Sequence, residues 1–196
     1  MRLPRFSVAL FAAAGLASCS LVADDQSALA IPHIQQEKLL CVPTAAAMIL
    51  AFYGDRQSPR KLKVLATGRK YDPTEPFNDF AITLYRDIIA AVRELGYVWQ
   101  ERSLTNDDAG FEQGLGIIAA ELRRGHPVMI DLSVPYGHTV VVSEVNDEQR
   151  SISLIDPEQP SPGTVALTFD QLRDHWNESA YGGNFRSLIL TQPKGG

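Results

Sequence analysis

The chain has 196 residues and a formal charge of −5, and its length fits one ordinary domain behind a short amino-terminal extension. The net negative charge argues against nucleic acid or anionic lipid headgroups as the main partner. The sequence contains no internal repeat, and no apolar run after the first thirty residues is long enough for a membrane helix. We therefore expect a single hydrophobic core.

The amino terminus has the order of charge, hydrophobicity and small residues that is typical of a bacterial secretory signal. Two arginines precede an apolar stretch over residues 6–16, which is too short to span a bilayer comfortably. The tetrapeptide "LASC" that ends at Cys19 resembles a lipobox, after which a lipoprotein signal peptidase leaves a diacylated cysteine. The alternative is ordinary secretion with cleavage near Ala23. We expect the lipoprotein, because a cysteine in this position is otherwise a poor choice in an oxidising compartment.

The lipobox divides the chain into three parts. We predict a signal peptide over residues 1–18, a lipidated tether over 19–30 and one domain over 31–196. Loss of Arg2 and Arg5 with the signal would take the formal charge from −5 to −7. Ser20 follows the cysteine in place of an aspartate, which resembles the signal for sorting to the outer membrane. The predicted location is therefore the periplasmic side of the envelope, with the lipid as the only contact with a membrane.

Acylation of Cys19 would leave Cys41 without an intramolecular partner. A free cysteine can be a small buried apolar side chain, or it can be a nucleophile. Cys41 lies just before an apolar, alanine-rich run over residues 43–53, which ends at a glycine and is predicted to be a helix. A thiol at a helix amino terminus meets the positive end of the helix dipole, and this stabilises the thiolate.

The remaining elements follow from apolar periodicity and from turn residues. After the first helix we expect helices first and strands later, which predicts an α+β domain. In chain order the expected elements are helices over 59–67, 82–95 and 111–124, with a strand over 97–102 between the last two, then strands over 128–134, 138–145, 151–156, 164–168 and 187–191, with a short helix over 170–176 before the last strand.

Attack of a thiolate on a carbonyl requires an oxyanion donor, a base and a group that orients the base. The glutamines just before Cys41, the string "GHTVVV" and the later string "SLIDP" together resemble the papain-like cysteine peptidase family 39, whose members include bacteriocin-leader-processing domains and free-standing relatives. The resemblance implies a papain-like fold over nearly the whole mature chain. It implies Gln35 as the oxyanion donor, Cys41 as the nucleophile, His138 as the base and acid, and Asp156 as the orienting group. Gln36 remains a one-residue alternative to Gln35.

The hairpin between the strands expected over 138–145 and 151–156 offers a register. If its turn centres on Asp147, directly opposed residues have a constant sum and His138 opposes Asp156. Asp156 precedes a proline, so it can also be read as the start of a turn. The other pairs that this register predicts are Val140 with Leu154, Val142 with Ile152, and Glu144 with Arg150.

The sequence thus predicts a lipid-anchored cysteine peptidase or amide-acyl hydrolase that acts on a peptide or protein without a cofactor or metal. No close zinc-ligand motif is present, and one cysteine with scattered histidines is weak evidence for such a site. The alternative is a catalytically idle papain-like fold that binds a peptide or assists an export system. Val42 is a reason to consider that alternative, because the family usually has glycine after its cysteine. Thioester chemistry would also permit transpeptidation if an amine replaced water.

Overall fold

The structure is a computed structural model that describes residues 28–76, 81–134, 137–179 and 182–195. The predicted signal peptide, Cys19 and most of the predicted tether lie outside these residues. None of the helices in the described ranges is long and apolar enough to cross a membrane.

A six-stranded antiparallel sheet forms the centre of the domain, with strands in the order β1-β6-β2-β3-β4-β5. The strands are β1 Gln100–Thr105, β2 Val128–Leu132, β3 His138–Asn146, β4 Ser151–Ile155, β5 Thr164–Thr168 and β6 Phe185–Leu190.

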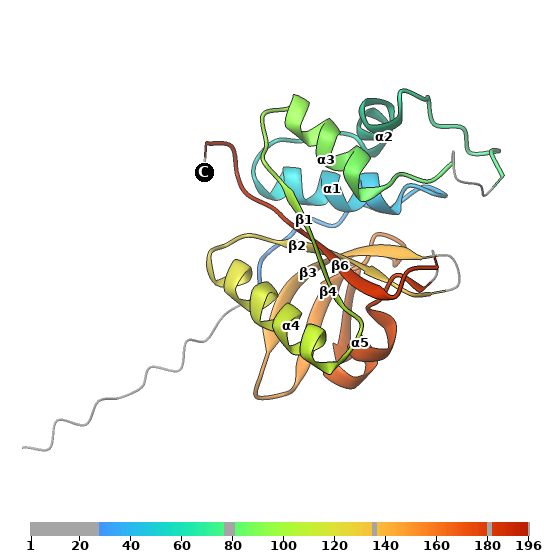
Figure 1. Ribbon diagram of the computed structural model, residues 1–196. Helices are drawn as coiled ribbons and strands as arrows, with labels where there is room; N and C mark the ends of the chain where they lie inside the picture. The colour runs from blue at the N-terminus through green and yellow to red at the C-terminus, as the bar shows by residue number, and fades with distance from the viewer. Residues whose placement is uncertain (1–27, 77–80, 135–136, 180–181, 196) are drawn as a thin grey trace, which may run out of the picture.

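Helices cover both faces of this sheet (Figure 1). One face carries α1 Cys41–Phe52, α2 Pro59–Thr67 and α3 Tyr85–Glu94, and the other carries α4 Asp108–Arg123 and α5 Phe169–His175. Each helix layer has its own apolar core against the sheet. The α+β fold class is confirmed, although α4 and α5 are not gathered ahead of the strands but are inserted between them in the chain.

The start of α2 is set by a local capping signal, whereas the start of α3 is set by a tertiary contact. The Ser58 hydroxyl accepts a hydrogen bond from the Lys61 N–H at 3.2 Å, so α2 begins where the Ser-Pro pair predicts. The helix that is expected from residue 82 begins instead at Tyr85. The reason is the buried ammonium of Lys63, which donates to the carbonyl oxygen of Ile82 at 2.9 Å and to the hydroxyl of Thr83 at 3.3 Å, so these residues stay outside the helix.

The first strand also begins later than expected, at Gln100 in place of residue 97. Tyr97 and Trp99 are both buried in the core around α1, and the ladder with β6 starts where Gln100 pairs with Leu190. Tyr97 and Trp99 therefore pack in the core just before the strand begins.

The predicted register of the β3–β4 hairpin is wrong. Val142 pairs with Leu154, not with Ile152, and Glu144 pairs with Ser153, not with Arg150. Two local features explain the shift: the turn contains four residues between Asn146 and Ser151, and the ladder is irregular between Val142 and Glu144, as a β-bulge produces.

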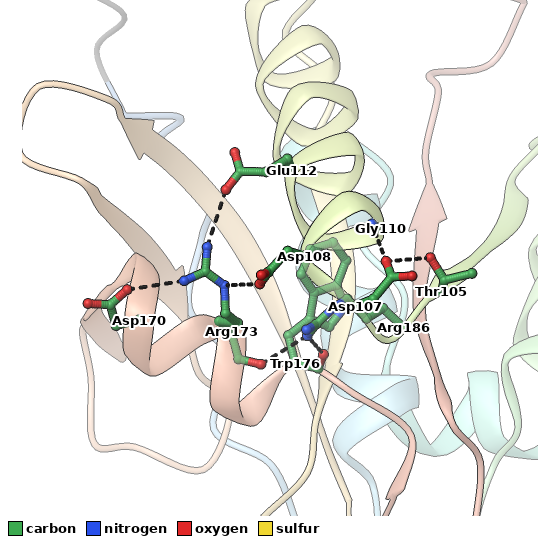
Figure 2. A network of polar contacts seen from close by, with 9 residues as sticks. All are labelled: Thr105, Asp107, Asp108, Gly110, Glu112, Asp170, Arg173, Trp176 and Arg186. Carbon is green, nitrogen blue, oxygen red and sulfur yellow. Dashed lines mark hydrogen bonds and ion pairs between the residues drawn. The ribbon is translucent and has the colours of Figure 1, made fainter.

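A buried arginine joins the carboxyl end of α5 to the core on the α4–α5 face (Figure 2). The guanidinium of Arg186 is 3% exposed and donates to the backbone carbonyl oxygens of Arg173 and Trp176. It also lies 5.3 Å from the centre of the Phe111 ring. The side chain of Arg173, by contrast, is 31% exposed and pairs with three carboxylates at the surface, those of Asp108, Glu112 and Asp170. Figure 2 also shows the amino end of α4, where the Asp107 carboxylate accepts the Gly110 N–H at 2.7 Å.

These two arginines should contribute very differently to stability. We expect Arg186→Met to lower the free energy of unfolding by about 2 to 4 kcal/mol, because two buried carbonyl oxygens lose their donor. Arg173→Met should cost about 1 kcal/mol or less, because its partners remain solvated. Urea unfolding of both variants measures the difference. Equal losses would show that the carbonyl contacts of Arg186 carry no special weight.

Candidate active site

Cys41 is the first residue of α1, as its position in the sequence predicts. A turn leads into the helix: the Leu40 N–H donates to the Glu37 carbonyl at 3.1 Å, and Leu39 has a left-handed φ of 63°. No side chain caps this helix start among the residues that the structure describes. The first N–H groups of α1 are therefore open to a negative charge. The thiol is free and its residue is partly exposed.

His138 begins β3 directly after Gly137, whose left-handed φ of 72° allows the chain to turn into the strand. His138 is 7% exposed, and its Nε2 lies 2.5 Å from Oδ1 of Asp156. The Cys41 thiol lies within hydrogen-bonding reach of the same ring. Since Asp156 occupies Nε2, the nitrogen that remains for the sulfur is Nδ1.

The three groups form one electrostatic unit. Burial alone would lower the pKa of His138, but the hydrogen bonds and charges of Asp156 and Cys41 outweigh burial and raise it to about 10. Burial alone would raise the pKa of Asp156, but the hydrogen bond to His138 and one from the Glu158 N–H hold that pKa below its usual range. These interactions therefore favour the charged, imidazolium form of His138.

Asp156 also begins the turn that the Asp-Pro pair predicts. Its Oδ1 accepts the Glu158 N–H at 2.8 Å while it contacts His138. The two interpretations of Asp156, turn residue and histidine partner, are thus compatible. His138 and Asp156 meet although the predicted direct opposition is wrong, because Asp156 lies just beyond the paired end of β4 and a side chain can reach a diagonal neighbour.

The two candidate glutamines point in different directions. The side-chain nitrogen of Gln35, an exposed residue, donates to the carbonyl oxygens of Pro157 at 3.3 Å and of Glu158 at 2.9 Å. Gln36 is less exposed, and its Oε1 is buried without a hydrogen-bond partner in the described part of the chain. The donor nitrogen of Gln35 is thus already engaged by two carbonyl oxygens of the loop that follows Asp156. This engagement of Gln35 favours Gln36, the alternative, as an oxyanion donor.

Val42, which departs from the family pattern, faces inward. It is 5% exposed and belongs to the apolar core around α1. Its β-branched side chain is therefore part of that core.

A buried carboxyl beside the site escaped the sequence analysis. Asp131 in β2 accepts a hydrogen bond from the Thr139 hydroxyl, and Thr139 is the residue after His138. Burial raises the pKa of Asp131 to about 6. Burial and the charge of Asp131 raise the pKa of Glu178 to about 7. The available signal was a lone acidic residue within the apolar run 128–134. In the described ranges, no group of three or more histidine, cysteine, aspartate or glutamate side chains is arranged to hold a metal ion.

Comparison with known proteins agrees with this geometry. The model of the Peptidase_C39 like family matches residues 28–183. The chain belongs to the peptidase C39-like family. No match to a curated protein is found.

Solved structures of C39 peptidase domains share the fold. A double glycine motif protease from an AMS/PCAT transporter, solved with a leader peptide, aligns over 87% of this chain and 96% of its own with 16% identity and a TM-score of 0.56. The peptidase domain of Streptococcus ComA, a bifunctional ABC transporter, aligns over 84% and 98% with 17% identity and a TM-score of 0.58. A C39-like peptidase from Bacillus anthracis aligns over 84% and 96% with 17% identity and a TM-score of 0.53. The papain-like C39 fold is therefore confirmed.

Proposed function

We propose that this C39-like protein is a cysteine peptidase or amide-acyl hydrolase that cleaves its substrate through a Cys41 thioester. The contact of His138 with both Cys41 and Asp156 is the observation that carries the proposal. A base that lies between a nucleophile and an orienting group is the arrangement that acyl transfer requires.

In the proposed reaction the proton of the thiol already resides on His138, so the reactive state is a thiolate beside a charged imidazolium, and the sulfur attacks the carbonyl carbon of the substrate. The negative oxygen that develops is held by the Cys41 N–H at the start of α1 and by the side chain of Gln36. His138 then gives its proton to the leaving amine as the C–N bond breaks, which leaves a thioester. A water molecule, deprotonated by His138, hydrolyses that thioester and restores the free thiol. Asp156 holds the ring and stabilises its charged form throughout.

We propose a peptide as the substrate class. Two proteins of the same fold are described as a double glycine motif protease with a leader peptide and as a bifunctional ABC transporter. These descriptions support a peptide substrate and a possible partner in an export system. Specificity depends on pocket shape and loops, so the double-glycine preference is not transferred.

Digestion of a peptide library by the purified protein tests the proposal, with product masses read before and after treatment with a thiol-directed electrophile. We expect cleavage that stops when one electrophile per chain has reacted with Cys41. No cleavage and no modification of Cys41 would favour the second candidate function, an idle papain-like fold that binds a peptide. The presence of Val42 where the family usually has glycine is the observation that supports this second candidate function.

Attachment to the membrane is a separate proposal, supported by the "LASC" sequence that ends at Cys19. We expect Cys19→Ser to move the protein from the membrane fraction to the soluble fraction of envelope preparations, because a diacylated amino terminus would be lost. Intact-mass analysis of the wild-type chain provides the independent measurement. An unmodified amino terminus beyond Ser20 would contradict the anchor without affecting the proposed chemistry.

A further inference from the structure

The segment before the nucleophile binds the backbone of the loop that carries Asp156. Nε2 of His33 lies 3.2 Å from the carbonyl oxygen of Asp156. The Gln36 N–H donates to the Pro157 carbonyl at 2.8 Å. The side chain of Gln35 donates to the same Pro157 carbonyl and to that of Glu158. Residues 33–36 thus bond to three consecutive carbonyl oxygens of this loop. Because the donors belong to a different segment of the chain, these hydrogen bonds restrain the position of the loop as a whole.

Asp156 needs such a support because strand pairing does not hold the residues that follow it. The last residue pair of the β4–β5 ladder is Ile155 with Thr164. Beyond that pair, the Asp156 N–H donates to the Gly163 carbonyl at 2.8 Å. The carboxylate of Asp156 bonds within its own turn, to the Glu158 N–H and to the side chain of Gln159 at 3.4 Å. These bonds shape the loop but do not fix its position relative to α1.

The ring of His33 packs closely against the backbone of this loop. Gly163 has a left-handed φ of 72°, and a Cβ added there would lie 2.2 Å from Cδ2 of His33 and 2.9 Å from the Asp156 carbonyl oxygen. A side chain at this position would therefore displace the ring or the carbonyl that it binds. The close approach of the Gly163 backbone to His33 completes a direct connection between residues 33–36 and the Asp156 loop.

We propose that His33 and Gln35 are positioning residues, which hold the Asp156 loop in the place where its carboxylate meets His138. The inference rests on the proposed function and assigns Gln35 a role different from the oxyanion donor that the sequence suggests. Residues 33–36 are joined to Cys41 by the short turn at 37–40, so the same segment connects the nucleophile's helix to the loop that carries Asp156.

The role has a measurable consequence at His138. The groups that face its ring are Cys41 from α1, Asp156 from the β4–β5 loop and, by charge, Asp131 from β2. If the loop loosens, the Asp156 carboxylate spends less time at Nε2 and the pKa of His138 falls. The alkaline limb of the activity profile then moves to lower pH. An oxyanion donor acts on the substrate oxygen and does not move this limb.

The test compares Gln35→Met, Gln36→Met and, as a matched control in the exposed β3–β4 turn, Gln149→Met. Methionine keeps the side-chain length and removes the donor. For Gln35→Met we expect kcat/KM to fall about 5- to 50-fold, with the alkaline limb about half a pH unit to one unit lower. For Gln36→Met we expect kcat to fall about 100-fold or more at every pH without a shift of the limb. Gln149→Met should change neither.

A double-variant experiment tests whether Gln35 acts through the carboxylate of Asp156. In an Asp156→Asn background, Gln35→Met should lower kcat/KM little further, because both substitutions act through the carboxylate of Asp156. The pH titration of the His138 ring by NMR, assigned with His138→Gln, gives the same information in the intact chain even if no substrate is cleaved. An unchanged His138 titration in Gln35→Met would overturn the inference, whereas a shifted titration without turnover would leave it standing and contradict only the proposed function.

Discussion

Replacement of Cys41 by alanine should reduce turnover of a cleaved peptide by at least about 10⁴-fold, to the residual rate that binding and oxyanion contacts alone supply. The sulfur is the atom that would form the thioester, so no other group replaces it. The fold should remain intact, because Cys41 is partly exposed and its loss should cost about 1 kcal/mol or less. Product formation and thermal unfolding, measured on the same preparation, separate the two effects.

Cys41→Ser is the matched variant for this experiment. It keeps the shape of the side chain but offers a hydroxyl that is a much poorer nucleophile near neutral pH, so it should be nearly as inactive as alanine. It should still bind peptide. If both variants retain turnover, the nucleophile lies elsewhere. If the wild type is also inactive but all three proteins bind the same peptide, the chain is a binder with a peptidase fold.

The second large effect is expected at His138. His138→Gln should lower kcat by about 10²- to 10⁴-fold, the usual contribution of general acid–base catalysis. Asp156→Asn should weaken activity and also change its pH dependence. Both follow from the 2.5 Å contact between Nε2 and Oδ1, which holds the ring in its charged form. Measurement of kcat/KM from pH 5 to pH 11 tests both variants.

The direction of the pH effect follows from the sign of the shift. The pKa of His138 is raised from about 6.5 to about 10, so the proton that the leaving amine requires is retained through neutral pH and lost only as the pH rises through about 10. The alkaline limb should therefore lie near pH 10 in the wild type and at lower pH in Asp156→Asn. A wild-type limb between pH 6 and 7 would show that Asp156 and Cys41 do not stabilise the charged ring.

Much of the fold was accessible from the sequence because the signals were local. Ser58 and Pro59 set the start of α2, Gly54 follows the end of α1, and β5 has the predicted bounds. The start of α3 was not accessible, because it depends on the buried Lys63 of α2, whose tertiary contacts keep Ile82 and Thr83 outside the helix.

The structure brings Cys41, His138 and Asp156 together as the sequence predicts, but the strand register that was expected to do so is wrong. The left-handed φ of 49° at Arg150 and the bond from the Gln149 N–H to the Asn146 side chain build a longer turn than the predicted one. Because the length of the turn determines the register, the observed β3–β4 pairs differ from the predicted ones. His138 and Asp156 nevertheless lie within reach of each other. The direction of the Gln35 side chain was equally inaccessible, because its partners, Pro157 and Glu158, lie over 120 residues away in the chain.

The place of β6 in the sheet has a consequence for how the protein folds. This strand comes last in the chain, yet it lies between β1 and β2. Just after it, Thr191 donates to the Pro127 carbonyl at 2.6 Å and contacts the Tyr53 hydroxyl at 2.8 Å, so the chain's last residues tie the end of α1 to the sheet. Contacts of such long sequence separation form slowly. A chain still emerging during synthesis lacks this central strand, so its thiol should gain catalytic competence only after β6 is available to join the sheet.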